Sequence, residues 1–236
     1  MKNWIFVRAR LDWSRDEFVR WVCDVANPQI EVLARDLIDC RMHVVPLEKF
    51  DIPGFLTDEG AASGETEARH YDAALMIEAK HDKHWQEFAA LLEAGAAAVH
   101  AVRASATVVK DNVAERNEQA PALLNDPGVT YLRPINFHPD MAPSAARRSW
   151  DLHAPFAVRT HVGASRYVQW WVEETLTPEG PPIAGIVELR FPTDTELGAK
   201  FFPSAFARED IARDTGHFIA DGPRLYTKEQ YLRLRA

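Results

Sequence analysis

The sequence lacks several features that mark large classes of protein. It has only two cysteines in 236 residues, Cys23 and Cys40, which form neither a disulfide framework nor a metal-ligand spacing. Apolar runs such as 94–99 are far shorter than the roughly 20 residues that a membrane helix needs. Arg8 follows the first apolar residues too early for a signal-peptide core. We therefore expect a reduced, cytoplasmic protein with no membrane partner.

Clusters of positive charge are also missing. The chain has 27 Lys and Arg against 35 Asp and Glu, a formal net charge of −8, and it has no basic arm. Because such a chain repels phosphate backbones, no nucleic-acid partner is expected. The glycine-containing segment 60–64 does not lead from a strand into a helix, so it is not a nucleotide-binding signature.

Aromatic residues, in contrast, are numerous, with seven Trp and twelve Phe. They indicate an unusually aromatic core or an aromatic cavity. Some are placed to fix helices: Ser14 and Glu17 form a predicted capping box, and Trp13 and Phe18 flank it at the positions of a hydrophobic staple. Thr193 begins a second capping box.

The hydrophobic pattern predicts the order strand, helix, strand, strand, helix, strand twice along the chain. Strands are expected at 4–9, 38–45, 71–79, 97–109, 129–137, 165–173, 185–191 and from 224 onward. Helices are expected after Ser14 and Asp82, at 143–160 with a break at Pro155, after Thr193 and at 210–218. The segment 51–70 is a long polar loop and a candidate lid.

This repeated order defines the domain prediction. The βαββαβ order is that of a ferredoxin-like domain, whose helices cover only one face of the sheet. Two such sheets can pack face to face and enclose a cavity between them. We therefore predict an α+β fold of two tandem ferredoxin-like repeats, 1–110 and 129–236, joined by a linker at 111–128.

Three segments of the second half carry a resemblance to a known family. They are 150–155 (WDLHAP), 161–169 (HVGASRYVQ) and 185–191 (GIVELRF), and Asp214 and Phe218 fit the last-helix pattern. Together they resemble the EthD-like family of the dimeric α+β barrel superfamily, although the Trp-to-His spacing of three is one shorter than usual. The resemblance implies an intrachain dimeric α+β barrel, either as a monomer or as a homodimer.

The first half looks like a diverged copy of the second. Ala26 stands where the family has a histidine, and Met76 stands where the second half has Glu188. We therefore expect one polar pocket in the second half and an apolar, degenerate one in the first.

His153 is the strongest catalytic candidate, because an imidazole suits general acid–base chemistry near neutral pH. The alternative is a buried structural histidine next to Pro155. Strand alternation puts Glu188 and Arg190 on the face directed into the cavity, where a carboxylate needs a partner. Glu188 could orient His153 or act as a second acid or base, or it could form a structural ion pair with Arg190 or Arg166.

Further candidates surround these two. His161 could be a second proton shuttle or a substrate contact, or it could cap the following strand. Tyr167 could donate a hydrogen bond to a developing enolate oxygen or serve as a sheet residue, and alternation does not decide which face it occupies. Arg190, Trp150 and Trp171 are further candidates for substrate binding.

No metal and no cofactor are predicted. His81 and His84 are spaced three apart but lack an accompanying carboxylate signature. Haem, which occurs in some relatives of the superfamily, requires a proximal histidine that no motif singles out.

These residues predict a cofactor-independent lyase or dehydratase that acts on a hydrophobic, ring-containing small molecule by His-based acid–base chemistry. An isomerase or cyclase using the same site is the first alternative. A non-catalytic EthD-like binding or accessory protein is the second.

Overall fold

The computed structural model describes residues 1–46, 71–79, 84–111 and 128–233. The predicted loop at 51–70, most of the predicted linker and His81 lie outside these residues. Within the described ranges, no helix combines the length and apolarity needed to cross a lipid bilayer.

The first half contains four strands and a set of helices in the predicted order. They are β1 (Lys2–Ala9), α1 (Arg15–Trp21), a π-helical turn η1 (Val22–Ala26), α2 (Asn27–Leu33), a 3₁₀ turn η2 (Ala34–Asp36), β2 (Asp39–Val44), β3 (Ala73–Glu78), α3 (His84–Glu93) and β4 (Ala96–Asp111). The capping box at Ser14 is present, with both hydrogen bonds to Glu17.

The second half repeats this order with one added strand. Its elements are β5 (Val129–Phe137), α6 (Pro143–Thr160), β6 (Arg166–Thr175), β7 (Gly185–Phe191), α7 (Asp194–Lys200), α8 (Ala205–Gly216), β8 (Ile219–Asp221) and β9 (Leu225–Arg233). The predicted break at Pro155 is wrong, since α6 continues through it. A proline removes one hydrogen bond from the helical ladder, and the rest of the helix tolerates that loss here.

The strands form a closed antiparallel barrel. Their order is β7-β6-β4-β1-β3-β2-β9-β5, and the pairing of β5 with β7 closes the ring, while β8 extends β5 at one end. The fold is therefore α+β with an eight-stranded barrel. The two halves meet where β4 pairs β6 and where β2 pairs β9.

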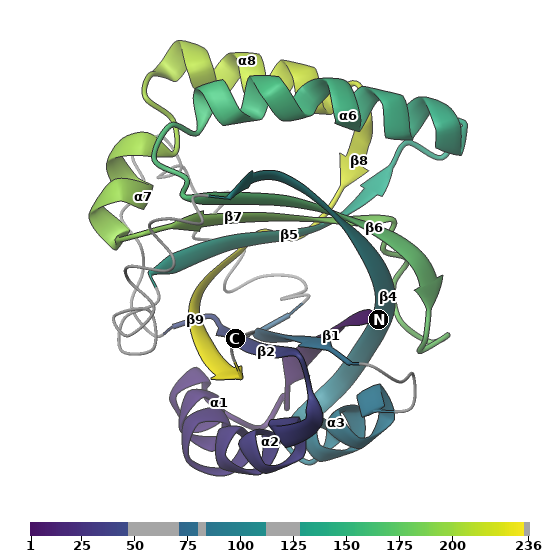
Figure 1. Cartoon of the computed structure of the whole chain (residues 1–236), viewed down its shortest axis with the longest axis vertical. Coiled ribbons are helices and arrows are strands. Elements are labelled where there is room, and N and C mark those ends of the chain that lie inside the picture. The colour runs from purple at the N-terminus through teal and green to yellow at the C-terminus, as the bar shows by residue number, and fades with distance from the viewer. Residues whose placement is uncertain (47–70, 80–83, 112–127, 234–236) are drawn as a thin grey trace.

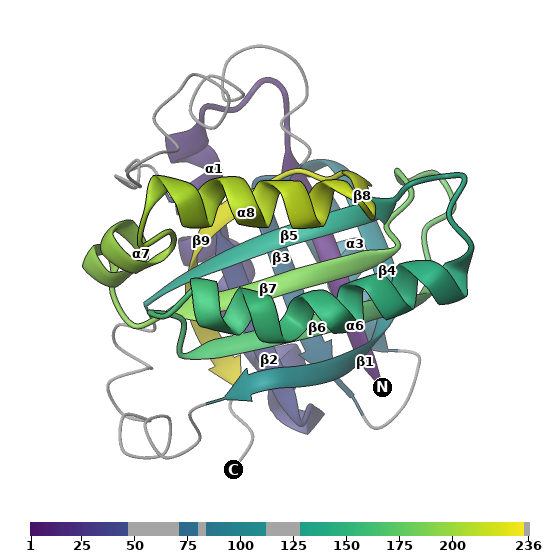
Figure 2. The same ribbon diagram turned by 90° about the horizontal axis from the view of Figure 1, so that it is seen from above.

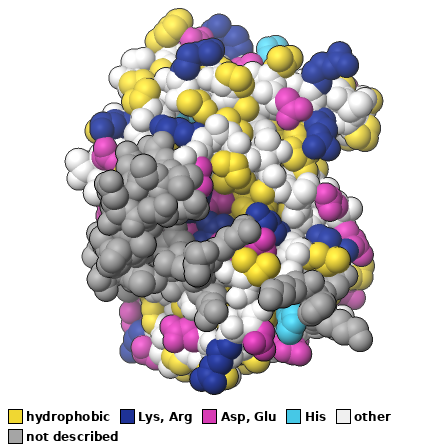
Figure 3. Space-filling view, viewed as in Figure 1, with side chains coloured by type: hydrophobic (Ala, Val, Ile, Leu, Met, Phe, Trp, Pro, Cys, Tyr) yellow, Lys and Arg dark blue, Asp and Glu magenta, His cyan; other side chains and the backbone are white. Residues whose placement is uncertain are grey.

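Helices cover the barrel on two opposite sides. α1, α2 and α3 pack on the strands of the first half, and α6, α7 and α8 lie over β5, β6 and β7 (Figures 1 and 2). Side chains of both charge signs are interspersed over the face seen in Figure 3. Each helical layer buries its own apolar cluster against the barrel, and a further cluster lies inside the barrel.

Alternation along β7 confirms the predicted division of its side chains. Ile186 belongs to the apolar cluster inside the barrel, and Glu188 bonds to groups inside it. Leu189 and Phe191 pack with the helices on the outside.

The barrel interior is filled with side chains. Trp4 and Trp170 meet edge to face at 5.3 Å, and Trp4 stacks with Phe6. Met76 and Leu132 complete this apolar part. These side chains therefore do not form the predicted aromatic cavity between the two sheets. Their rings pack on one another as a core.

The remaining part of the interior contains a network of charges. Glu188 on β7 and Glu229 on β9 are fully buried. Arg41 Nη1 donates to Oε1 of Glu188 at 2.9 Å and of Glu229 at 3.1 Å. Arg166 Nη2 also donates to both carboxylates, at 2.8 Å to Glu229 Oε1, and Arg190 Nε lies 3.9 Å from Glu229 Oε2. We call these five residues the barrel charge network.

Neutral donors complete the coordination of both carboxylates. Trp170 Nε1 donates to Glu188 Oε2 at 2.8 Å, and Thr130 Oγ1 donates to Glu229 Oε2 at 3.0 Å. Burial by itself raises the pKa of Glu188, but Arg166 and Arg41 outweigh it and lower that pKa to about 2. Both glutamates are therefore ionised at neutral pH, and Glu188 plays the role of a structural ion pair.

Replacing Glu188 with Gln should destabilise the protein by about 3–5 kcal/mol, because the charge lost is one partner of a buried pair. Glu174 provides a matched control, since its side chain is 53% exposed and pairs with Arg103 on the same sheet. Glu174→Gln should cost no more than about 1 kcal/mol. Urea unfolding measures both values, and equal losses would contradict a supporting role for the barrel charge network.

Acid should destabilise the protein in two stages. Burial lowers the pKa of His43 from 6.5 to about 4, so the folded state keeps this ring neutral while the unfolded state protonates it. Stability should fall as the pH drops from 6.5 toward 4, and again from about 4.5 toward 2 as Glu188 is protonated.

Urea unfolding at a series of pH values measures these stages. In the first stage, between pH 6.5 and 4, His43→Gln should reduce the slope of the unfolding free energy against pH by about 1.4 kcal/mol per pH unit. An unchanged slope in this variant would show that the titration of His43 does not contribute to the first stage.

Candidate functional site

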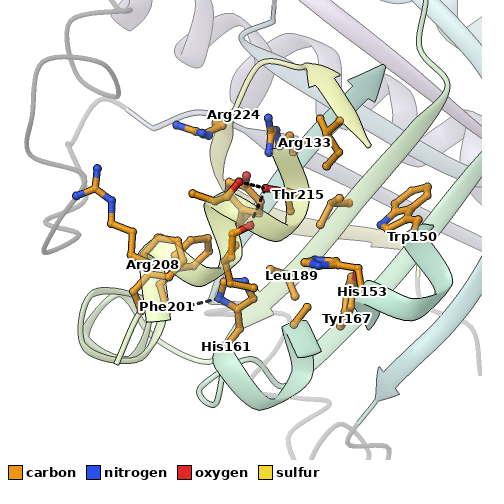
Figure 4. Close-up of a pocket in the computed structure, with 17 residues that line it drawn as sticks. Arg133, Trp150, His153, His161, Tyr167, Leu189, Phe201, Arg208, Thr215 and Arg224 are labelled. Atoms are coloured by element: carbon orange, nitrogen blue, oxygen red, sulfur yellow. Dashed lines mark hydrogen bonds between the residues drawn. The ribbon is translucent and has the colours of Figure 1, made fainter. Parts of the chain in front are cut away.

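A cavity of about 230 Å³ lies outside the barrel, between the helices of the second half and the sheet beneath them (Figure 4). Side chains from β5, β6, β7, α6 and α8 line it, as do residues that follow α7. Much of its wall is aromatic, formed by Tyr131, Trp150, Tyr167, Phe201 and Phe202.

His153 reaches this cavity from α6. Its Nδ1 lies 2.5 Å from Oδ2 of Asp214 on α8, and the residue is only 7% exposed. Because an ionised carboxylate only accepts hydrogen bonds, Nδ1 carries the proton and Nε2 keeps its lone pair in the neutral ring. Figure 4 shows the imidazole between Trp150 and Leu189.

The environment of His153 keeps the ring neutral and ready to accept a proton. Burial lowers the pKa of His153, and the hydrogen bond and charge of Asp214 oppose that shift. The same carboxylate would stabilise the imidazolium formed when Nε2 takes a proton. His153 and Asp214 therefore form a base and the group that orients it.

His161 presents a second neutral imidazole at the end of α6. Its Nδ1 donates to the Phe201 carbonyl at 2.6 Å, which again leaves Nε2 unprotonated. Burial lowers its pKa to about 4, although that hydrogen bond opposes the shift, so His161 is a weaker base than an ordinary histidine. Its ring packs against Phe201 at 4.6 Å.

Tyr167 faces the helices and lines the cavity, which resolves the choice that alternation left open. Gln169 Nε2 donates to Tyr167 Oη at 3.0 Å and to the Trp150 carbonyl at 2.9 Å. Burial raises the pKa of Tyr167, so the phenol keeps its proton and can donate it in a hydrogen bond. Gly185 lets Trp150 approach β7, because a Cβ there would lie 2.4 Å from the indole ring.

Three arginines also line the cavity: Arg133 on β5, Arg208 on α8 and Arg224 just before β9. Arg133 is half-buried, and its Nε donates to the Gly222 carbonyl at 3.4 Å. No Asp or Glu is among the described residues that line the cavity. The lining is therefore positively charged.

The structure brings together four of the predicted site residues: His153, His161, Tyr167 and Trp150. Trp171 lies behind Trp150, with ring centroids 4.4 Å apart, and is not part of the lining.

Glu188 and Arg190 belong to the barrel charge network on the other face of the sheet. The expectation that Glu188 orients His153 is therefore wrong, because alternation directs the two side chains to opposite sides of the sheet.

Sequence reasoning missed the partner of His153 and the arginines. Asp214 belongs only to the resemblance in the last helix, and it stands 61 positions after His153, beyond the reach of local patterns. Arg133 could have been found, because alternation places it on the same strand face as Tyr131.

The two first-half positions expected to border an apolar pocket lie in two different apolar clusters. Ala26 is fully buried within the apolar cluster under α1, α2 and α3. Met76 is buried inside the barrel. The cavity around His153 is lined by residues of the second half, and an apolar, degenerate pocket in the first half stays a prediction.

No family model matches the sequence, and no curated protein matches it. Solved structures match its fold over nearly the whole length. An anthrone oxidase-like protein has a TM-score of 0.56 at 7% identity, with 100% of this chain and 94% of that chain covered. A Fusobacterium nucleatum protein assigned provisionally as a monooxygenase has a TM-score of 0.52 at 8% identity, with 98% of this chain and 92% of that chain covered.

A chlorite dismutase variant from Candidatus Nitrospira defluvii also shares the fold. It has a TM-score of 0.50 at 9% identity, with 98% of this chain and 91% of that chain covered. At these identities the likeness establishes the fold alone, an α+β fold around a closed antiparallel barrel.

The predicted lyase or dehydratase, and with it the isomerase or cyclase, is a wrong assignment. The three similar structures are described as an oxidase-like protein, a monooxygenase and a chlorite dismutase, which are descriptions of oxidative chemistry. The separation of Glu188 from His153 removes the acid–base pair on which the lyase prediction depended.

The cavity can be tested against haem. An imidazole whose Nδ1 is held by a carboxylate, as in His153, is a common arrangement for a metal ligand. The cavity of about 230 Å³ is smaller than the roughly 300–1,000 Å³ of sites for drug-sized ligands, and a porphyrin is larger than most of these. The described residues therefore do not fit haem. Nor does the described part of the chain contain a group of three or more His, Cys, Asp or Glu that could hold a metal ion.

Replacing Asp214 with Asn should lower the pKa of His153 further, because the carboxylate is the group that raises it. NMR titration of the imidazole protons measures this shift. Asp210→Asn is the matched control, since Asp210 lies on the same helix and pairs with Arg213 at 3.6 Å. If the pKa of His153 stays the same or rises in Asp214→Asn, that result would contradict the hydrogen bond between His153 and Asp214.

Proposed function

We propose that the protein is an enzyme that oxidises a small aromatic molecule with dioxygen in the cavity under α6 and α8. The observation that carries this proposal is the neutral His153, held by Asp214 at 2.5 Å, in an aromatic cavity. The descriptions of the similar structures as oxidase-like and monooxygenase support oxidation as the reaction class.

The reaction begins with proton removal. His153 Nε2 takes a proton from a CH₂ group that is activated by an aromatic ring conjugated with a carbonyl, and Asp214 stabilises the imidazolium. The carbanion that remains is rich enough in electrons to reduce dioxygen by one electron, and the two radicals combine into a peroxide.

Collapse of the peroxide completes the reaction. The His153 imidazolium first protonates the outer peroxide oxygen, which returns Nε2 to its basic form. Nε2 then takes the remaining C–H proton as the O–O bond breaks, and the departing hydroxide receives that proton from the imidazolium. One oxygen atom becomes the new carbonyl and the other leaves as water, so that R₂CH₂ and O₂ give R₂C=O and H₂O.

Other residues of the cavity position the substrate. Tyr167 keeps its proton and can donate a hydrogen bond to the enolate oxygen that develops in the first step. Phe202, which lines the cavity and is partly exposed, offers a ring for packing against a flat molecule. His161 has a low pKa and acts as a hydrogen-bond acceptor from the substrate.

We also infer that the two halves are tandem ferredoxin-like repeats, 1–110 and 129–236. The first half has the strand order β4-β1-β3-β2, and the second has the equivalent order β9-β5-β7-β6. The likeness to the EthD-like family rests on segments 150–155, 161–169 and 185–191, which supply His153, His161 and Tyr167 to the cavity.

Oxygen uptake with anthrone as the probe tests the proposal. The wild-type protein should consume dioxygen and place one atom of ¹⁸O₂ in the product, as mass spectrometry would show. His153→Ala should lower kcat by about 10²–10⁴, the usual contribution of a positioned base.

His217 provides the matched control, since it is exposed at the end of α8 and does not line the cavity. His217→Ala should retain full activity. Turnover by His153→Ala at the wild-type rate, or no oxygen uptake by the wild-type protein, would overturn the proposal.

A further inference from the structure

The cavity differs in charge from the protein that surrounds it. The whole chain carries a formal net charge of −8. Among the described residues that line the cavity, however, the ionised side chains are Arg133, Arg208 and Arg224. The pKa values of His153 and His161 are lowered, so these rings add no charge at neutral pH. Arg208 and Arg224 each take part in another interaction and Arg224 is exposed, so the selection of an anion at short range depends on Arg133.

The arginines and the base lie at different ends of the cavity. Figure 4 shows Arg133 and Arg224 across the cavity from His153 and Tyr167. Aromatic rings form much of the rest of the wall.

Arg133 is the best placed of the three for recognition. It lies on a strand of the barrel and is half-buried, and its Nε is oriented by the Gly222 carbonyl at 3.4 Å. A guanidinium with its position fixed in this way binds a planar carboxylate through parallel N–H donors. Partial burial also makes the interaction less screened than at an exposed surface.

We propose that the cavity binds an aromatic carboxylate, with the ring against the aromatic wall of the cavity and the carboxylate at Arg133. This inference names the substrate class of the site and rests on the proposed function for its location. The anion then lies at the end opposite to His153, so that the ring carbon that loses the proton faces Nε2.

Binding of two matched probes tests the inference. 2-Naphthoate and 2-naphthalenemethanol have the same rings and differ in the charge of the substituent. Isothermal titration at pH 7.5 should give a Kd at least ten-fold lower for the carboxylate. Raising the salt concentration should weaken the binding of the carboxylate and leave the binding of the alcohol unchanged.

Variants of Arg133 identify the residue responsible. Arg133→Gln should raise the Kd of 2-naphthoate about ten-fold and leave that of the alcohol within two-fold, and Arg133→Lys should restore part of the loss. Arg213→Gln is the control, because Arg213 is 71% exposed on α8 and does not line the cavity. It should change neither Kd, and thermal unfolding checks that each variant folds.

The outcomes separate this inference from the proposed function. Three results would each overturn the carboxylate assignment. They are equal affinity for the two probes, an equal effect of Arg133→Gln on both Kd values, and no binding of either probe at millimolar concentration. If the wild-type protein still oxidises anthrone, the proposed function survives that result. Carboxylate binding that depends on Arg133, together with no oxygen uptake, supports the assignment and rejects the oxidation.

Discussion

The buried contact between two carboxylates and three arginines inside the barrel is the constraint on which the structure depends. Glu188 and Glu229 have no access to water, so each must be neutralised where it lies. Arg41 comes from β2, Arg166 from β6 and Arg190 from β7, and the network therefore forms only when both halves have assembled. The network links the pair of strands β2 and β9, where the two halves meet, to β6 and β7.

This network also fixes where a ligand can bind. With the barrel interior filled by charges and indole rings, the described space for a small molecule lies on the outer face of the same strands. Arg166 and Tyr167 are adjacent in sequence, as are Glu188 and Leu189, and in each pair one residue faces the network and the other the cavity. A change in the network can therefore reach the cavity through a single peptide unit.

Local patterns in the sequence were enough to predict the elements and the inward direction of Glu188. The capping box at Ser14 and the N-cap at Thr193 depend on neighbours three residues away, so the sequence contains the whole signal. The partners of Glu188 could not be predicted in this way, since Arg41 lies 147 residues away. Alternation divides a strand into two faces but does not tell which face borders an empty space, because that depends on how the helices pack above it.

The difference between the halves shows why the fold alone does not define the activity. Both halves place helices over a four-stranded sheet, yet Ala26 lies within a closed apolar cluster while His153 borders a cavity. A pocket requires that the helical layer leave space and that polar groups in that space satisfy one another, as His153 and Asp214 do. Similar structures at 7–9% identity share the barrel. The chemistry of this protein must therefore be argued from the pair of groups that its second helical layer keeps in contact.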